Sequence, residues 1–163
     1  MKRQFLAGAL LALAFAAAPV RAADDTALLR MATCQDSWLD WSKTAPPALK
    51  AFGDRVRSQF SHSGNDPFAT PKAPIFVAGL RVVQAFPQSV GMGVGFSLTV
   101  AANFDTARKA YEAALGKTLT HCEASDGMHS CELEIAPQRT AVLMSADNEP
   151  GRTLIGCYYL YEK

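Results

Sequence analysis

The chain lacks the sequence signatures of the common enzyme classes. It contains no Gly-x-Ser-x-Gly elbow, no His-Glu-x-x-His pair and no Walker loop, the motifs that mark serine hydrolases, zinc peptidases and phosphate-binding ATPases. The glycine-rich run from Gly91 to Gly95 is not a dinucleotide-binding fingerprint, because its third glycine is misplaced and no helix is predicted to follow. No cofactor is therefore expected, and a binding role is favoured over catalysis.

An excess of charge of one sign is also missing. The chain has 16 basic and 15 acidic residues, and removal of residues 1–22 leaves 13 basic and 15 acidic. This balance gives no electrostatic reason to expect nucleic acid or an anionic membrane as a partner. Beyond the N-terminus there is no apolar run of the ~20 residues that a membrane-spanning helix needs, so no transmembrane segment is predicted there.

Residues 1–22 are typical of a cleaved secretory signal peptide. Lys2 and Arg3 form a basic start, Phe5–Ala18 is apolar, and Val20-Arg21-Ala22 provides a cleavage site. The alternative is an uncleaved membrane anchor, but the apolar run is short for a span. We expect a protein of the periplasm or the cell exterior.

The remaining chain, residues 23–163, is long enough for one domain with a hydrophobic core. It holds all four cysteines, and an exported chain meets oxidising conditions that favour disulfides. We therefore expect a single α+β domain that is stapled by two disulfides.

The sharpest local pattern is a hairpin centred on Asp126-Gly127, since Asp-Gly is the strongest signal for a two-residue turn. With this pair at the tip, Cys122 lies opposite Cys131 at a non-hydrogen-bonded position, where Cα atoms are ~4.5 Å apart. That separation suits a disulfide. The sequence thus predicts Cys122–Cys131 and, from the cysteines that remain, Cys34–Cys157.

The hairpin residues suggest two further chemistries. Cys122, His129 and Cys131 share a face and could hold zinc or Cu(I), but their spacing matches no structural zinc pattern and no metal is predicted. His121 and Glu132 are opposed and could form a base with its orienting carboxylate, although such pairs are ordinary on exposed sheet surfaces.

Hydrophobic periodicity predicts two N-terminal helices followed by a mainly antiparallel sheet of about six strands. The first helix is expected from Asp24 or Asp25 to about Lys43, and the second opens at Pro46-Pro47. The expected order after them is strand-strand-helix-strand-strand-strand-strand, with the helices packed on the sheet. Two strands form the hairpin within 117–136, the other strands are predicted at 77–86, 94–100, 140–146 and 153–161, and the helix is predicted at 104–115.

One predicted strand has a nearly bare face made by Gly93, Gly95, Ser97 and Thr99. Such a strip lets a backbone or an aromatic ring approach closely. The tryptophans of the first helix, Trp38 and Trp41, or an Ala-rich helix are the candidate neighbours. A ligand groove is the alternative.

Ser61–Pro74 is the one long irregular segment, and loops of this length are often functional. Its candidate binding residues are His62, Asn65, Asp66 and Phe68. The alternative is a solvated connector without a role in binding.

Size, export and the predicted disulfides favour a small binding protein, such as an inhibitor or immunity-type partner of another envelope protein. The alternatives are an envelope-acting hydrolase in which residues 61–74 form a lid, and a structural or stress-related envelope protein.

Overall fold

The computed structural model describes residues 24–36, 47–64, 67–90 and 93–160. Within these ranges the α+β class is confirmed, with three helices and nine strands. In chain order the elements are α1 (Thr26–Ala32), α2 (Pro47–Gln59), β1 (Phe60–His62), β2 (Ala69–Pro71), β3 (Phe76–Val77), β4 (Leu80–Val90), β5 (Gly93–Val100), α3 (Phe104–Leu115), β6 (His121–Ser125), β7 (Met128–Ala136), β8 (Arg139–Ala146) and β9 (Thr153–Leu160).

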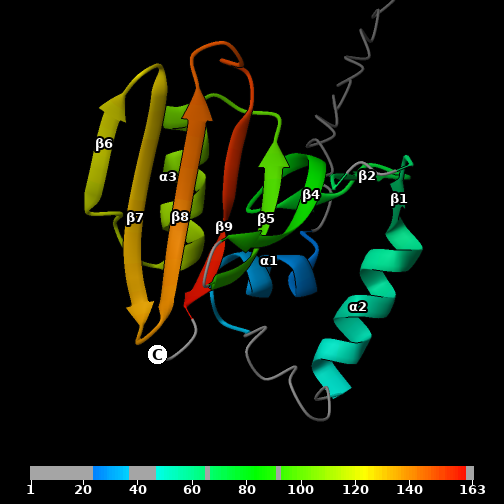
Figure 1. Cartoon of the computed structure of the whole chain (residues 1–163). Coiled ribbons are helices and arrows are strands. Elements are labelled where there is room, and N and C mark those ends of the chain that lie inside the picture. Colours follow the sequence, from blue (N-terminus) through cyan, green and yellow to red (C-terminus); the bar gives the residue numbers. More distant parts are fainter. Residues whose placement is uncertain (1–23, 37–46, 65–66, 91–92, 161–163) are drawn as a thin grey trace, which may run out of the picture.

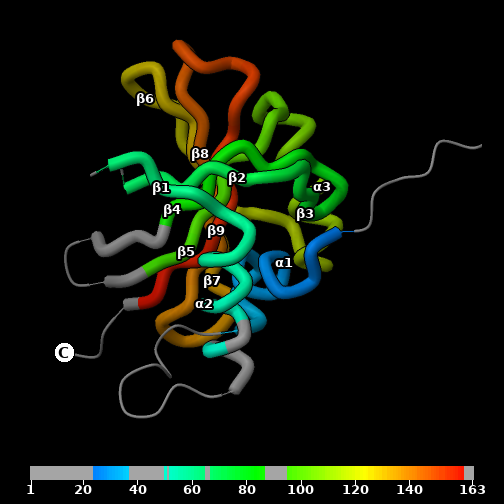
Figure 2. Tube along the Cα trace, turned by 90° about the vertical axis from the view of Figure 1, so that its right-hand side faces the viewer, coloured from blue at the N-terminus to red at the C-terminus, as the bar shows by residue number. Residues whose placement is uncertain are grey.

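The strands form an antiparallel sheet in the order β1-β2-β4-β5-β9-β8-β7-β6, and β3 pairs with β4 beside this path. Helices α1 and α3 lie on the same side of the sheet, as Figures 1 and 2 show, while α2 stands at the β1 end. The hydroxyl of Tyr111 in α3 donates a hydrogen bond to the carbonyl oxygen of Ala32 at the end of α1, 2.6 Å away. The opposite side of the sheet is covered by none of these three helices.

The hairpin prediction is confirmed in its register. Asp126 and Gly127 form the tip with positive φ values of 51° and 75°, as a two-residue hairpin turn requires. Cys122 pairs with Cys131 across β6 and β7, and the two residues are joined in a disulfide. The turn residues therefore position the cysteines for their bond.

The second predicted disulfide, Cys34–Cys157, is also present and spans 123 residues of sequence. It fixes the segment after α1 to β9, in the middle of the sheet. Tyr159 strengthens this connection, because its hydroxyl donates to the carbonyl oxygen of Asp36 at 2.6 Å.

The predicted extent of the first helix is wrong. Asp25 caps it as expected, with its carboxylate accepting from the amides of Ala27 and Leu28, but α1 ends at Ala32 instead of running to about Lys43. Cys34 adopts a left-handed backbone with φ 61°, which is incompatible with a continuing helix. The remaining part of the predicted stripe, with Trp38 and Trp41, lies outside the described residues.

The prediction of six strands is corrected to nine among the described residues, because the short strands β1, β2 and β3 were missed. Two of them fall in Ser61–Pro74, which is therefore not irregular throughout: β1 and β2 pair with each other, and Ala69 pairs with Ala85 of β4. Ala69 is fully buried. Its pairing with a distant strand therefore orders this segment, although the segment's own sequence shows no hydrophobic periodicity.

Helix α2 begins close to the predicted position, and α3 both begins and ends there. Pro47 is the first residue of α2, where a proline costs no helical hydrogen bond. Asn103 caps α3 by accepting from the amide of Thr106, and Gly116 ends it with φ 64°, a conformation that glycine adopts readily.

The core lies between the sheet and its helices and includes Phe52 of α2, which packs against Phe96 of β5. Ile155, Cys157 and Tyr159 alternate along β9 on the helix-covered face and are fully buried. The Tyr111 hydroxyl lies 2.7 Å from the carbonyl oxygen of Gly156, and burial raises the pKa of this hydroxyl far above its usual value. Tyr111 thus remains a neutral donor that ties α3 to both α1 and β9.

In the part of the chain that the structure describes, no helix combines the length and apolar character needed to cross a membrane. Residues 1–23 lie outside the described ranges, so the signal peptide stays a prediction.

Candidate functional site

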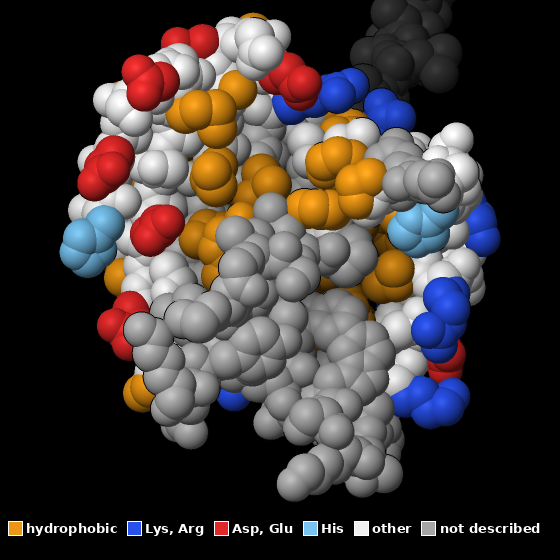
Figure 3. Space-filling view, viewed as in Figure 1, with side chains coloured by type: hydrophobic (Ala, Val, Ile, Leu, Met, Phe, Trp, Pro, Cys, Tyr) orange, Lys and Arg blue, Asp and Glu red, His pale blue; other side chains and the backbone are white. Residues whose placement is uncertain are grey.

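The side of the sheet opposite α1 and α3, named here the open face, is the surface on which a site can form. The alternation of β9 places Leu154, Gly156 and Tyr158 on it, because Ile155, Cys157 and Tyr159 face the helices. The register then adds Thr99 of β5 and Met144 of β8, which both pair with Leu154. Figure 3 views this face and shows apolar side chains gathered on its visible part.

A hollow of about 480 Å³ lies on the open face. Its apolar lining comes from six residues on four strands or their immediate ends: Phe68, Met128, Met144, Ala146, Leu154 and Tyr158. Polar groups complete the lining: Gln84, Thr99, Ser145, Glu149 and Arg152. We name this feature the open-face hollow.

The lining combines apolar and charged groups. Among the described residues, Met128 is the large apolar side chain that is exposed, with 40% of its area accessible. Arg152 lies 3.6 Å from Glu149, and both side chains are exposed, so this ion pair adds little stability. The hollow thus offers thioether and aliphatic surface beside one loosely held ion pair, which suits an apolar group entering from solvent.

The predicted bare strip of β5 is present beside this hollow. At Gly95 an added Cβ would lie 2.4 Å from a ring carbon of Tyr158, so the absence of a side chain lets that ring lie against the strand. An aromatic ring approaches the strip closely, as predicted, but it is the ring of Tyr158 from β9 and not a side chain of a helix. The predicted neighbours Trp38 and Trp41 lie outside the described residues. The space beside Gly156 is equally small, since an added Cβ there would lie 2.5 Å from the carbonyl oxygen of Phe96.

Of the four residues predicted to bind a partner, Phe68 lines the open-face hollow. Its ring packs on Phe86 of β4, with ring centroids 4.7 Å apart, and it is half-buried. His62 is exposed at the end of β1, away from the hollow lining. Asn65 and Asp66 lie outside the described residues, so their predicted role stays a prediction.

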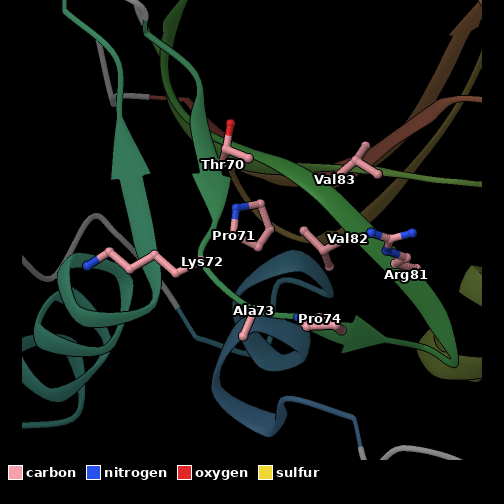
Figure 4. Close-up of a pocket in the computed structure, with 8 residues that line it drawn as sticks. All are labelled: Thr70, Pro71, Lys72, Ala73, Pro74, Arg81, Val82 and Val83. Atoms are coloured by element: carbon pink, nitrogen blue, oxygen red, sulfur yellow. The ribbon is translucent and has the colours of Figure 1, made fainter.

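The second half of the predicted segment lines a smaller cavity of about 240 Å³ between β2 and β4 (Figure 4). It forms where β4 shifts register between Val82 and Gln84. Lys72 points away from this cavity toward α2, and its ammonium donates to the carbonyl oxygens of Arg57 and Ser58 at the end of that helix. This lysine therefore has a structural task.

A third cavity of about 230 Å³ contains His129 and Asp147. His129 Nε2 lies 3.0 Å from Asp147 Oδ1, and the His129 ring lies at a tilt of 47° to the ring of Phe104, with centroids 5.6 Å apart. Ser145 is opposite His129 in the register, but no side-chain hydrogen bond joins these two described residues. The base–nucleophile contact of a hydrolase is thus not formed here.

The hairpin residues considered for a metal site or for a His-Glu base have other partners. His121 pairs with Glu132 in the register, but its hydrogen bond, at 3.2 Å, is between Nδ1 and Thr120 Oγ1. Cys122 and Cys131 are joined in a disulfide, so neither has a thiolate to bind a metal. Among the described residues, no three His, Cys, Asp or Glu side chains gather in a way that suits a metal ion.

Sequence reasoning missed the open-face hollow as a unit. The alternation of each strand indicates which side chains share a face, but the order β4-β5-β9-β8-β7 brings together residues from 68 to 158.

Comparison of the chain with protein-family models, with characterised proteins and with solved structures found no match.

Proposed function

We propose that this protein is a small exported binding protein that docks another envelope protein on the open face of its sheet. The observation that carries the proposal is the open-face hollow, an apolar depression of about 480 Å³ on a face that α1, α2 and α3 leave uncovered. Exposed apolar surface of this kind typically marks an interaction site.

The floor and walls of the hollow come from a rigid part of the molecule. Leu154 and Tyr158 belong to β9, which pairs along its length with β5 and β8 and is tied to the segment after α1 by Cys34–Cys157. A surface that is already ordered loses little conformational entropy on binding, which favours affinity. Apolar anchor residues that enter such pockets supply most of the binding energy of protein interfaces.

Within this proposal, an inhibitor or immunity-type role fits best. Such a protein needs a stable scaffold and one preformed contact surface. Two disulfides supply the first, and the open-face hollow supplies the second.

The test is a comparative pull-down from envelope extract. The variant Leu154→Gln places a neutral polar group in the hollow, whereas Ala113→Gln makes a matched change on an exposed position of α3. We expect the same discrete partner to be recovered by the wild type and by Ala113→Gln, with at least a tenfold lower yield for Leu154→Gln. Circular dichroism confirms that all three proteins are folded.

Equal recovery of that partner by the wild type and by Leu154→Gln would contradict the proposal. Loss of recovery with Ala113→Gln alone would place the contact surface on the helix-covered side instead.

A further inference from the structure

The open face carries an acidic strip beside its hollow. Glu132 and Glu134 lie on the open face of β7, because the alternate residues Cys131 and Leu133 pack in the core. Glu123 of β6 faces the same way, since it alternates with Cys122, which is bonded to Cys131. All three carboxylates are exposed, and we name them the acidic strip.

The strip and the hollow belong to one continuous surface. Glu123 pairs with Ser130, Ser130 pairs with Met144, and Met144 pairs with Leu154. These four residues form a single cross-strand row over β6, β7, β8 and β9. With neighbouring strands ~4.8 Å apart, the backbone of Glu123 is about 10 Å from that of Met144, within reach of one bound peptide segment.

The charge of this strip is not neutralised within the described structure. None of the ion pairs among described residues involves Glu123, Glu132 or Glu134. The sequences of β5, β6, β7 and β9 contain no lysine or arginine. Arg139 of β8 pairs with the core residue Tyr159, which places it on the helix-covered face.

Among the described residues, one cation lines the hollow: Arg152, which is paired with Glu149. Lys50, Arg55 and Arg57 belong to α2. In Figure 3 acidic side chains follow the β6 side of the open face, while basic ones lie near α2 and along the upper edge of the view. A partner on this face therefore meets negative charge on one flank of the apolar hollow. Anionic lipid headgroups would be repelled by that flank, so a membrane surface is disfavoured.

We infer that the open face binds a cationic segment of a partner protein, with an apolar side chain in the open-face hollow and lysine or arginine residues over the acidic strip. The inference deepens the proposed function and rests on it. Opposite charges around an apolar anchor raise the rate of association and fix the orientation of the partner. The partner is thus a protein with a basic contact surface.

The experiment measures binding of a defined probe, a short synthetic peptide with a Leu-Trp-Leu core flanked by lysines, by fluorescence anisotropy. The test variant is Glu132→Gln/Glu134→Gln. Its control, Asp54→Asn/Asp105→Asn, alters net charge equally at exposed positions of α2 and α3. At about 20 mM salt the test variant is expected to bind about tenfold more weakly than the wild type and the control, and the difference should vanish near 500 mM salt.

The outcomes separate the inference from the proposed function. Unchanged affinity of Glu132→Gln/Glu134→Gln at low salt, or equal binding of a peptide with glutamates in place of the lysines, would overturn the inference. If Met144→Gln/Leu154→Gln still abolishes binding in that case, the apolar hollow stands as the docking site. If Met144→Gln/Leu154→Gln binds the peptide like the wild type, the hollow is not the docking site. If the wild type itself does not bind the lysine peptide, the inference of a cationic partner segment is wrong.

Discussion

Replacing Cys34 and Cys157 together by alanine is expected to lower the free energy of unfolding by up to about 5 kcal/mol. The bond closes a loop of 123 residues, and a cross-link stabilises a protein mainly by limiting the unfolded chain, more so for a longer loop. Both cysteines are buried, so alanine avoids placing unpaired hydroxyl groups in the core. Urea denaturation followed by circular dichroism measures the change.

The hairpin disulfide provides the matched control. Cys122 and Cys131 are separated by nine residues, and the same loop-entropy relation gives them a contribution of about 3 kcal/mol or less. The double variant Cys122→Ala/Cys131→Ala should therefore unfold at a higher urea concentration than Cys34→Ala/Cys157→Ala. The reverse order would show that the long-range bond does not dominate the stability of this fold.

Gly156→Ala is expected to destabilise the protein by about 3 kcal/mol, at the upper end of the usual cost of overpacking a core. The added Cβ would lie 2.5 Å from the carbonyl oxygen of Phe96 and 2.8 Å from the Cα of Ser97. Both atoms belong to the backbone of β5, so relief requires the two central strands to separate. Thermal unfolding of the purified variant measures the effect.

Gly151→Ala is the control for this substitution. An added Cβ at Gly151 meets no atom within 4 Å, so the stability should stay within about 0.5 kcal/mol of the wild type or rise slightly, because alanine narrows the unfolded ensemble. Equal stability of the two alanine variants would contradict the close approach of β5 and β9.

The features that the sequence predicts well have local causes. Asp126-Gly127 imposes its turn on the neighbouring residues, and that turn alone places Cys122 opposite Cys131. Helix α3 is equally local, since its cap at Asn103 and its end at Gly116 lie within the segment itself. Neither prediction needed knowledge of any distant part of the chain.

The features that were predicted wrongly depend on contacts between residues that are far apart in the sequence. Helix α1 ends where residues far along the chain hold the backbone: Tyr111 binds the carbonyl oxygen of Ala32, and Tyr159 binds that of Asp36. The short strand β2 exists because Ala69 pairs with Ala85. A helical stripe or a proline-rich composition cannot reveal such contacts.

The candidate site shows the same division. Phe68 was selected from the sequence as an available apolar group in a loop, and the structure places it in the open-face hollow against Phe86. The remaining lining could not be assembled from the sequence, because Met144 and Leu154 become neighbours of Phe68 only through the strand order of the sheet. The alternation of a strand indicates which of its side chains share a face, but not which strands lie beside it in the sheet.

The central claim is that the open face, and not the helix-covered side, meets the partner, and site-specific photo-crosslinking tests it most directly. A photoreactive residue is placed at Met128, on the exposed rim of the open-face hollow, or at Ala113, exposed on α3. Each protein is irradiated in envelope extract and its adducts are separated by mass. We predict one discrete protein adduct from position 128 and none from position 113; an adduct from position 113 with none from position 128 would contradict the claim.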